Sequence, residues 1–400
     1  MREDKKTFLI RAFSIKEIEN KFAEIGVHPS GIKIMKDKFS FLIFYITNLS
    51  PVECNILKQE ALACGAEAAV PRSAVDCKLK SGDAFISGTR KELRHLAIKL
   101  KQEPFFLKEI GNFIEKSLSE EHRPVFRISR EKIISFDERP LIMGILNITP
   151  DSFSDGGRFF NTKDAIEHGL RLAEEGADII DIGGESTRPG AEEIEASEEI
   201  NRVIPVIKAL TERIRQPISI DTTKSEVAIA ALEHGAQIIN DISGLRFDKK
   251  MAKVAAKYKC GLIVMHTRDR PKVMQKGEIK YKNLIADITS YLSESIKIAT
   301  DAGVDFENIV IDPGIGFGKT AEHNIEIIKN ILAFRSLNRP VLIGVSRKSI
   351  IGYITGRDVS DREFGSTSLH TYLALNGVDI LRVHNVKAAI DAIKVARALI

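Results

Sequence analysis

Short runs of apolar, mostly β-branched residues recur from residue 141 to the end of the chain, and each run ends in polar residues or glycine. The eight runs span 141–147, 177–184, 217–223, 236–243, 261–267, 308–314, 340–347 and 378–385. Each run is nearly continuous rather than alternating, which is typical of parallel strands covered on both faces. Helical patterns separate the runs, as in 164–177 and 224–236. Eight strand–helix units in roughly 260 residues predict an α/β fold, a (β/α)8 TIM barrel, and such even units argue against a doubly wound sheet.

The first 125 residues carry a different, mixed pattern. Their order of strand-like and helical stretches is β-α-β-β-α-β, which is typical of a ferredoxin-like unit. The expected strands and hairpin lie at 6–13, 31–47, 66–70 and 83–88, and the expected helices lie at 14–26, 51–65, 89–100 and 104–118. Residues 119–132 are charged and lack apolar periodicity. We therefore expect a smaller α+β extension over 1–125, a linker over 126–140 and the barrel over 141–400.

Composition narrows the range of partners. The net charge is +4 and no block of Lys or Arg stands out, which fits an anionic small molecule and gives no sign of nucleic-acid binding. The four cysteines form no C-x-x-C pair, so we expect free thiols rather than a zinc or redox motif. No apolar stretch has the length of a signal peptide or a membrane span, so the sequence predicts a cytoplasmic protein without membrane contact.

Polar residues follow every predicted strand of the barrel. The carboxyl ends of the strands line one mouth, where the active sites of such barrels form. A single Asp or Asn there is commonly a helix cap or turn residue, which is the simpler interpretation of Asp151, Asp155 and Asp241, and we expect His266 to be a hydrogen-bonded core residue. Agreement among all eight strands nevertheless favours a site. The strand ends carry Asn147, 183–190, Asp221, Asn240 with Asp241, His266, 312–319, 346–349, and Arg382 with His384.

The residue types at the mouth indicate two neighbouring kinds of ligand group. Carboxylates accept from ring N–H and amino groups and a lysine donates to a carbonyl, so one set suits a flat heterocycle with an amino-pyrimidinone edge. Arg382 and His384, two apart on one strand, face the same side and suit a phosphate or pyrophosphate. Asn147 offers an oxygen ligand that Mg²⁺ takes beside substrate phosphates. The heterocycle set consists of Asp221, Asn240, Asp312 and Lys348.

A protein nucleophile is not indicated. The sequence shows no Ser or Cys at a spacing that pairs it with a base, and Ser349 has no nearby His. The reaction at this mouth is therefore expected to proceed without a covalent enzyme intermediate.

Seven motifs, in their order along residues 141–400, resemble those of dihydropteroate synthases. They are NITPDSFSDGG, GGESTRPGA, IDTTKSEVA, INDISG, IDPGIGFGKT, GVSRKSIIG and RVHNV. The resemblance implies condensation of (7,8-dihydropterin-6-yl)methyl diphosphate with 4-aminobenzoate, which yields 7,8-dihydropteroate and pyrophosphate in folate synthesis. Any one motif alone would be weak evidence, whereas seven in order are highly specific.

The resemblance also assigns roles at matching positions. Mg²⁺ would bind Asn147, and two mobile loops, 149–157 and 184–190, would close over the substrates. The pterin would be held by Asp221, Asn240, Asp312 and Lys348. The diphosphate would contact Thr187, Arg382 and His384. The 4-aminobenzoate site would be lined by Arg188, Pro189, Phe317 and Ser349. Catalysis would rest on Asp155, Arg188, Lys348, Arg382 and His384.

Other interpretations remain open at this stage. A methyltetrahydrofolate–corrinoid methyltransferase shares the barrel and some pterin contacts, but the loop TPDSFSDGG and the strand end SRKS argue against it. A non-enzymatic barrel would show gaps among the motif residues, and none is found. The family resemblance implies a homodimer formed through barrel helices. Residues 1–140 lie outside the resemblance and have no assigned chemistry; docking, regulation and stabilisation are the candidate roles.

Overall fold

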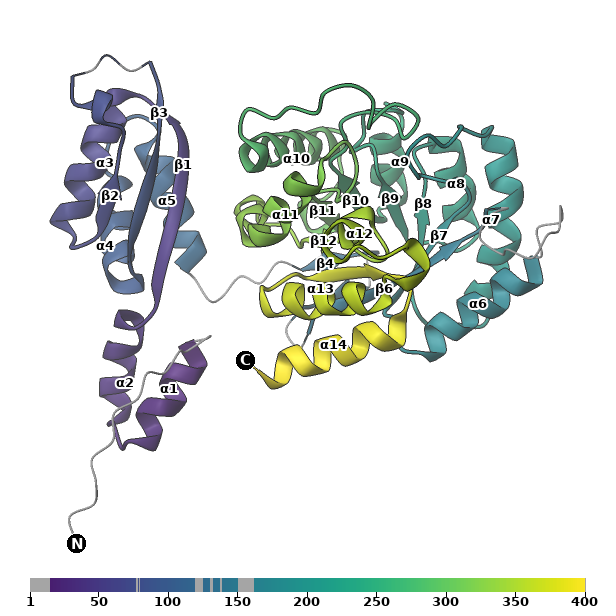
Figure 1. The fold of residues 1–400 in the computed structure, drawn as a ribbon, viewed down its shortest axis with the longest axis horizontal. Helices are drawn as coiled ribbons and strands as arrows, with labels where there is room; N and C mark the ends of the chain where they lie inside the picture. Colours follow the sequence, from purple (N-terminus) through teal and green to yellow (C-terminus); the bar gives the residue numbers. More distant parts are fainter. Residues whose placement is uncertain are drawn as a thin grey trace, which may run out of the picture. The chain divides into compact units, whose positions relative to one another are not determined.

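The computed structural model describes residues 15–76, 78, 80–118, 125–129, 132–136, 139–149 and 162–399 (Figure 1). The chain divides into two compact units, one within residues 1–122 and the other within residues 123–399. Each unit has its own apolar core and is described by itself.

The second unit is the predicted barrel. Its eight parallel strands pair in the order β11-β10-β9-β8-β7-β6-β13-β12, and a parallel bridge between Ile311 and Val341 joins the two ends of the sheet. The strands are β6 (Leu141–Asn147), β7 (Ile179–Gly183), β8 (Ile218–Asp221), β9 (Ile238–Asp241), β10 (Gly261–Met265), β11 (Ile309–Asp312), β12 (Leu342–Ile343) and β13 (Ile380–Val383). Every one of them falls within a run that the hydrophobic pattern predicts.

Helices surround this sheet, as Figure 1 shows. Outward-facing strand residues such as Ile180, Ile220 and Ile239 pack with buried helix residues in one large cluster, which explains why the strands are apolar on both faces. The helices are α6 (Thr162–Glu174), α7 (Ala196–Thr211), α8 (Ser225–Glu233), α9 (Met251–Tyr258), α10 (Leu284–Asp301), α11 (Ala321–Lys329), α12 (Ser349–Thr355), α13 (Glu363–Leu375) and α14 (Val386–Ala398). Within the described residues, no helix combines the length and the apolarity needed to cross a membrane.

A short hairpin closes the end of the barrel opposite the mouth. Strands β4 (Phe126–Arg127) and β5 (Ile133–Ile134) pair antiparallel. Phe126, Ile128 and Phe136 are buried in one cluster with the inward side chains at the start of the barrel strands. The ring of Phe126 lies 2.6 Å from the position that a Cβ would take on Gly261, so the close packing requires glycine there. The segment expected as a linker over 126–140 therefore contributes core residues, because its alternating apolar positions form a strand pair.

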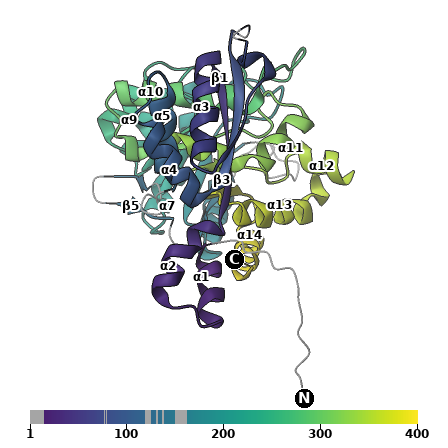
Figure 2. The same ribbon diagram turned by 90° about the vertical axis from the view of Figure 1, so that its left-hand side faces the viewer.

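The first unit contains a three-stranded sheet with the order β1-β3-β2. Strand β3 pairs antiparallel with both neighbours, and α3 connects β1 to β2, which is a split β-α-β arrangement. Helices α3 and α4 cover one face of this sheet (Figure 2). The elements are α1 (Ile15–Glu24), α2 (Pro29–Met35), β1 (Phe41–Leu49), α3 (Pro51–Ala63), β2 (Glu67–Ala69), β3 (Gly82–Thr89), α4 (Arg90–Leu100) and α5 (Leu107–Leu118).

The α+β class of this unit is confirmed, and one element differs from the sequence prediction. The stretch 31–47 was expected to form a hairpin, but its first part lies in helix α2 and only β1 is a strand. Pro29 occupies the first turn of α2 and the side chain of His28 accepts a hydrogen bond from the Ser30 amide, so the helix start is capped. The expected strand 6–13 lies outside the described residues.

The hairpin packing predicts a stability effect. Phe126→Ala removes a fully buried ring and should lower the free energy of unfolding of the barrel by about 3–5 kcal/mol. Ile133→Ala, on the same hairpin but 49% exposed, should cost less than about 1 kcal/mol. Urea unfolding followed by far-UV circular dichroism measures both variants. Equal effects would contradict the packing of Phe126 inside the barrel.

Candidate active site

The predicted mouth residues lie on neighbouring strands at one end of the barrel. Asn147 ends β6 and pairs in register with Gly183 of β7, which in turn pairs with Asp221 of β8. Asp221 pairs in register with Asn240 of β9. Parallel strands in register therefore bring residues from four separate motifs side by side.

Arg382 is fixed between two carboxylates. Its Nε donates to Asp181 Oδ2 at 2.6 Å and its Nη2 donates to Asp221 Oδ2 at 2.7 Å. The Nδ2 of Asn240 donates to the same oxygen of Asp181 at 3.1 Å. Asp181 is fully buried and was not among the predicted site residues. The sequence feature that could have identified Asp181 is its position as an acidic residue inside an apolar run. It lies two residues before Gly183 and therefore on the same face of the strand.

Burial and neighbouring charges set the electrostatics of this cluster. Burial raises the pKa of Asp221 to about 7, with Arg382 opposing the increase and Asp181 adding to it. Burial disfavours the charge of Arg382, but the two carboxylates outweigh that effect and the pKa of Arg382 is raised. Within the described residues, Oδ1 of Asp181 and Oδ1 of Asp221 are buried without a hydrogen-bond partner. Buried acceptors of this kind are usually satisfied by a ligand or water.

Asp312, Lys348 and Phe317 form a second group. Asp312 ends β11 and accepts a hydrogen bond from the Gly314 amide at 2.7 Å. The ammonium of Lys348 lies 4.3 Å from the centre of the Phe317 ring. Burial raises the pKa of Asp312 to about 6, which Lys348 opposes, and burial lowers the pKa of Lys348 to about 8. Both groups can therefore change protonation state near neutral pH.

His384 is held by a serine of the neighbouring strand end. The Oγ of Ser346 lies 3.1 Å from His384 Nδ1 and accepts from the His384 amide at 3.3 Å. Burial lowers the pKa of His384 to about 3, and Arg347, Arg382 and Arg188 act in the same direction. The neutral imidazole therefore has its other nitrogen, Nε2, for a ligand. Ser346 lies in the motif SRKS but was not itself predicted.

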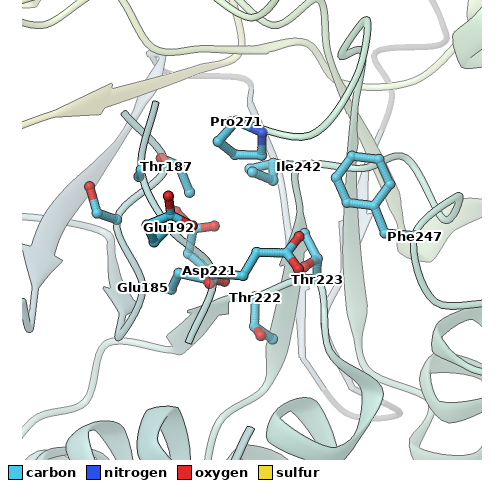
Figure 3. Close-up of a pocket in the computed structure, with 12 residues that line it drawn as sticks. Glu185, Thr187, Glu192, Asp221, Thr222, Thr223, Ile242, Phe247 and Pro271 are labelled. Carbon is cyan, nitrogen blue, oxygen red and sulfur yellow. The ribbon is translucent and has the colours of Figure 1, made fainter. Parts of the chain in front are cut away.

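The loop after β7 borders a cavity that includes Asp221 (Figure 3). The cavity is lined by Glu185, Ser186, Thr187, Ala191, Glu192, Glu193, Asp221, Thr222, Thr223, Ile242, Phe247 and Pro271. The Gly190 amide donates to Pro271 O, and Lys272 pairs with Glu192 at 2.7 Å. This loop therefore rests against the segment that follows β10. It places Thr187 at the cavity, whereas Arg188 and Pro189 are exposed beside it.

Of the remaining candidate residues, Ser349 and His266 lie within the part of the chain that the structure describes. Ser349 is the first residue of α12, directly after Lys348. His266 is buried, and its Nδ1 lies 2.7 Å from Lys319 Nζ, which agrees with its expected place as a hydrogen-bonded core residue. Asp155, with the loop 150–161, lies outside the described residues.

Comparisons with known proteins agree with this geometry. Residues 143–384 match the family described as "Pterin binding enzyme". The dihydropteroate synthase of Clostridium beijerinckii is 49% identical over 256 residues, which are 64% of this chain and 92% of that protein. The structure of Xanthomonas albilineans dihydropteroate synthase with 4-aminobenzoic acid has a TM-score of 0.63 and 42% identity, and the match covers 69% of this chain and 98% of that one.

A third relative extends the match beyond the barrel. It is a probable bifunctional folylpolyglutamate synthase/dihydropteroate synthase of Halobacterium salinarum, 36% identical over 388 residues. The match covers 96% of this chain and 46% of that protein, so it includes most of the N-terminal unit as well as the barrel.

The barrel and its polar mouth therefore define a pterin-binding enzyme. More particularly, the chain belongs to the dihydropteroate synthase family, as its seven motifs predict, and it is a transferase of folate biosynthesis. The comparisons favour this family over the methyltransferase alternative.

The raised pKa of Asp312 predicts pH-dependent pterin binding. The affinity for a dihydropterin should fall as the pH is lowered through about 6, because a protonated Asp312 accepts fewer hydrogen bonds. In Asp312→Asn this step should be absent, with the remaining pH dependence near 7 following Asp221. At pH 8, Asp312→Asn should weaken the binding free energy for the dihydropterin by about 1–3 kcal/mol relative to the wild type.

Isothermal titration calorimetry between pH 5 and about 8 tests this prediction. The exposed Asp305→Asn is the matched control and should bind like the wild type. An unchanged pH profile in Asp312→Asn would exclude Asp312 from the pterin contact.

Proposed function

We propose that this protein joins (7,8-dihydropterin-6-yl)methyl diphosphate and 4-aminobenzoate into 7,8-dihydropteroate, with release of pyrophosphate. The observation that carries the proposal is the meeting, at one barrel mouth, of buried carboxylates for the pterin with a fixed arginine for the diphosphate. In the reaction the methylene C–O bond breaks, the amine nitrogen forms a bond to that carbon, and the amine proton leaves. The chain's residues act by holding the reactants and stabilising charge rather than by supplying a nucleophile.

At the pterin end, Asp221 and Asp312 accept from the ring N–H and amino groups, and Lys348 donates to the carbonyl. The unpartnered Oδ1 of Asp221 supports this role, because a ligand donor would satisfy it. Asn240 adds an amide whose orientation is set by its bond to Asp181. Phe317 and Ser349, with Arg188 and Pro189 of the loop, line the 4-aminobenzoate site.

At the diphosphate end, Arg382, His384 and Thr187 receive the leaving pyrophosphate. Arg382 keeps its positive charge because Asp181 and Asp221 flank it, so its charge is available as negative charge develops on the leaving group. His384 donates from its neutral ring. Closure of the loop that carries Arg188 would exclude water from the cationic methylene carbon.

The residues beside Asn147 fit a magnesium ion. Oδ1 of Asn147 lies 3.7 Å from the position that a Cβ would take on Gly183, so the glycine leaves space beside this oxygen donor. An amide oxygen is a ligand that Mg²⁺ takes beside substrate phosphates. Among the described residues no cluster of three His, Cys, Asp or Glu side chains forms a metal cage, so the diphosphate and water would complete the shell. Mg²⁺ bound by Asn147 would supply charge neutralisation of the pyrophosphate.

The proposal places the protein in the cytoplasm. Cys54, Cys64 and Cys260 are free thiols in the structure, which is the usual state of cysteines in a reducing compartment. Its ligands are small molecules, and neither nucleic acid nor a membrane is required.

A two-substrate assay tests the reaction. Pyrophosphate should appear only when the diphosphate and 4-aminobenzoate are both present, with dihydropteroate detected in equal amount by mass spectrometry. Asn147→Ala should raise the Mg²⁺ concentration for half-maximal rate at least several-fold, whereas the exposed Asn201→Ala on α7 should leave it unchanged. Pyrophosphate release without 4-aminobenzoate, or none at all, would overturn the proposed reaction.

We propose that the homodimer forms through α12 and α13. The segment from Tyr353 to Phe364 carries four exposed apolar side chains, and Phe364 at the start of α13 is 79% exposed. Contiguous exposed apolar residues on a folded surface commonly mark a protein interface. The four residues are Tyr353, Ile354, Val359 and Phe364.

Phe364→Glu should therefore shift the protein from dimer to monomer, because a charge would be buried at the interface. Light scattering after size-exclusion chromatography measures the mass. Ile133→Glu on the hairpin is the control for an exposed apolar residue outside the patch and should leave the mass unchanged. A wild-type monomer at micromolar concentration would refute the dimer.

A further inference from the structure

A buried lysine beside the site has no role in the chemistry described so far. Lys319 ends the turn DPGIGFGK after β11 and is only 3% exposed. Its Nζ lies 2.7 Å from His266 Nδ1 and donates to Phe317 O at 3.1 Å and to His266 O at 3.4 Å. These contacts give the ammonium three acceptors, so all of its N–H groups have partners.

The turn that carries Lys319 is pressed against the end of β10. A Cβ on Gly314 would lie 2.0 Å from His266 O, and a Cβ on Gly318 would lie 2.2 Å from the Cβ of Arg268. Both glycines also have positive φ, so the turn requires glycine at these positions. The backbone of the turn thus packs directly against residues 266–268, and the side chain of Lys319 adds a polar contact between the turn and His266.

Retaining a charged group at this depth is costly. Burial lowers the pKa of Lys319 well below its usual value and Lys348 adds to the decrease, whereas Asp312 opposes it. An apolar side chain of similar length would fill the space without that cost. His266 cannot share the charge, because burial lowers its pKa to about 2 and Nδ1 stays an acceptor. If position 319 served packing alone, an apolar residue would therefore be favoured there over lysine.

We propose that Lys319, held by His266, is a positioning residue that fixes Asp312 and Phe317 at the two ends of one turn. This inference rests on the proposed function, in which Asp312 binds the pterin and Phe317 lines the 4-aminobenzoate site. Lys319 acts on Phe317 by donating to its carbonyl, and on Asp312 through the short turn that joins the two residues, with the charge of Lys319 as a second contribution. One side chain would thus couple the two substrate subsites.

Asp312 provides a readout of this role. The positive groups that favour its ionised form are Lys348 at the start of α12, Lys319 on the turn and Arg382 on β13. Removing one of these three charges should raise the pH at which Asp312 protonates. Loss of packing alone would instead lower that pH, because water would reach Asp312 and reduce the burial that raises its pKa.

The test compares Lys319→Met with Lys329→Met, an exposed lysine on α11, in the full chain. Dihydropterin affinity is measured by calorimetry across pH, and KM for each substrate is measured separately. In Lys319→Met the dihydropterin affinity should fall at least tenfold, the midpoint of its pH dependence should move to higher pH, and KM for 4-aminobenzoate should rise. Lys329→Met should match the wild type in all three.

A second variant covers the case in which Lys319→Met does not fold. His266→Phe keeps a ring but removes the acceptor for Lys319, and it should give a smaller change in the same direction. A folded Lys319→Met with wild-type affinity and pH midpoint would overturn the inference, and so would a folded His266→Phe without any change. Calorimetric dihydropterin binding does not require turnover, so failure of the proposed reaction in the wild type would be seen separately.

Discussion

The mouth of the barrel depends on the ion pairs that Arg382 makes with Asp181 and Asp221. Two carboxylates on adjacent strands would repel one another in a buried site, and the guanidinium between them removes that repulsion. Arg382 reaches from β13 past β6 to β7 and β8, so the interaction also ties together strands that are not neighbours. The interaction holds the positive charge of Arg382 in place for the diphosphate, and it leaves Oδ1 of Asp221 available for the pterin.

This polar mouth rests on an apolar layer within the same barrel. Inward residues two positions apart change from apolar to polar along several strands: Ile179 is followed by Asp181, Val310 by Asp312. The apolar residues of these pairs, Ile179 and Val310, pack with the hairpin residue Phe126, which shields the end of the barrel opposite the mouth. The desolvation cost of the buried charges at the mouth offsets much of what their ion pairs contribute to stability. The well-packed apolar layer at the other end of the barrel therefore supplies stability that the polar mouth does not.

The positions around the mouth are set by contacts between successive loops. The loop after β7 rests on the segment after β10 through Gly190 and Pro271, and that segment in turn contacts the turn after β11. The amide of Gln275 and the hydroxyl of Tyr281 both donate to backbone carbonyls of this turn. The loop after β7, the segment after β10 and the turn after β11 are therefore linked by a continuous series of hydrogen bonds around the mouth.

The sequence alone determined the barrel, its eight strands and most of the mouth, because continuous apolar runs and strand-end polar residues are local patterns. It did not predict Asp181, which is 201 residues from Arg382 along the chain and meets it only when the barrel closes. Nor did the sequence predict the contact between Lys319 and His266, which are 53 residues apart. From the sequence, residues 126–136 resemble a charged linker, and only the barrel core shows that Phe126 is buried there. Helix α2 also forms where the sequence predicted a strand, because the capped start of this helix favours helix more strongly than its β-branched residues favour strand. Tertiary structure decided these points, since the burial of a side chain and the partner of a charge are set by residues distant in sequence.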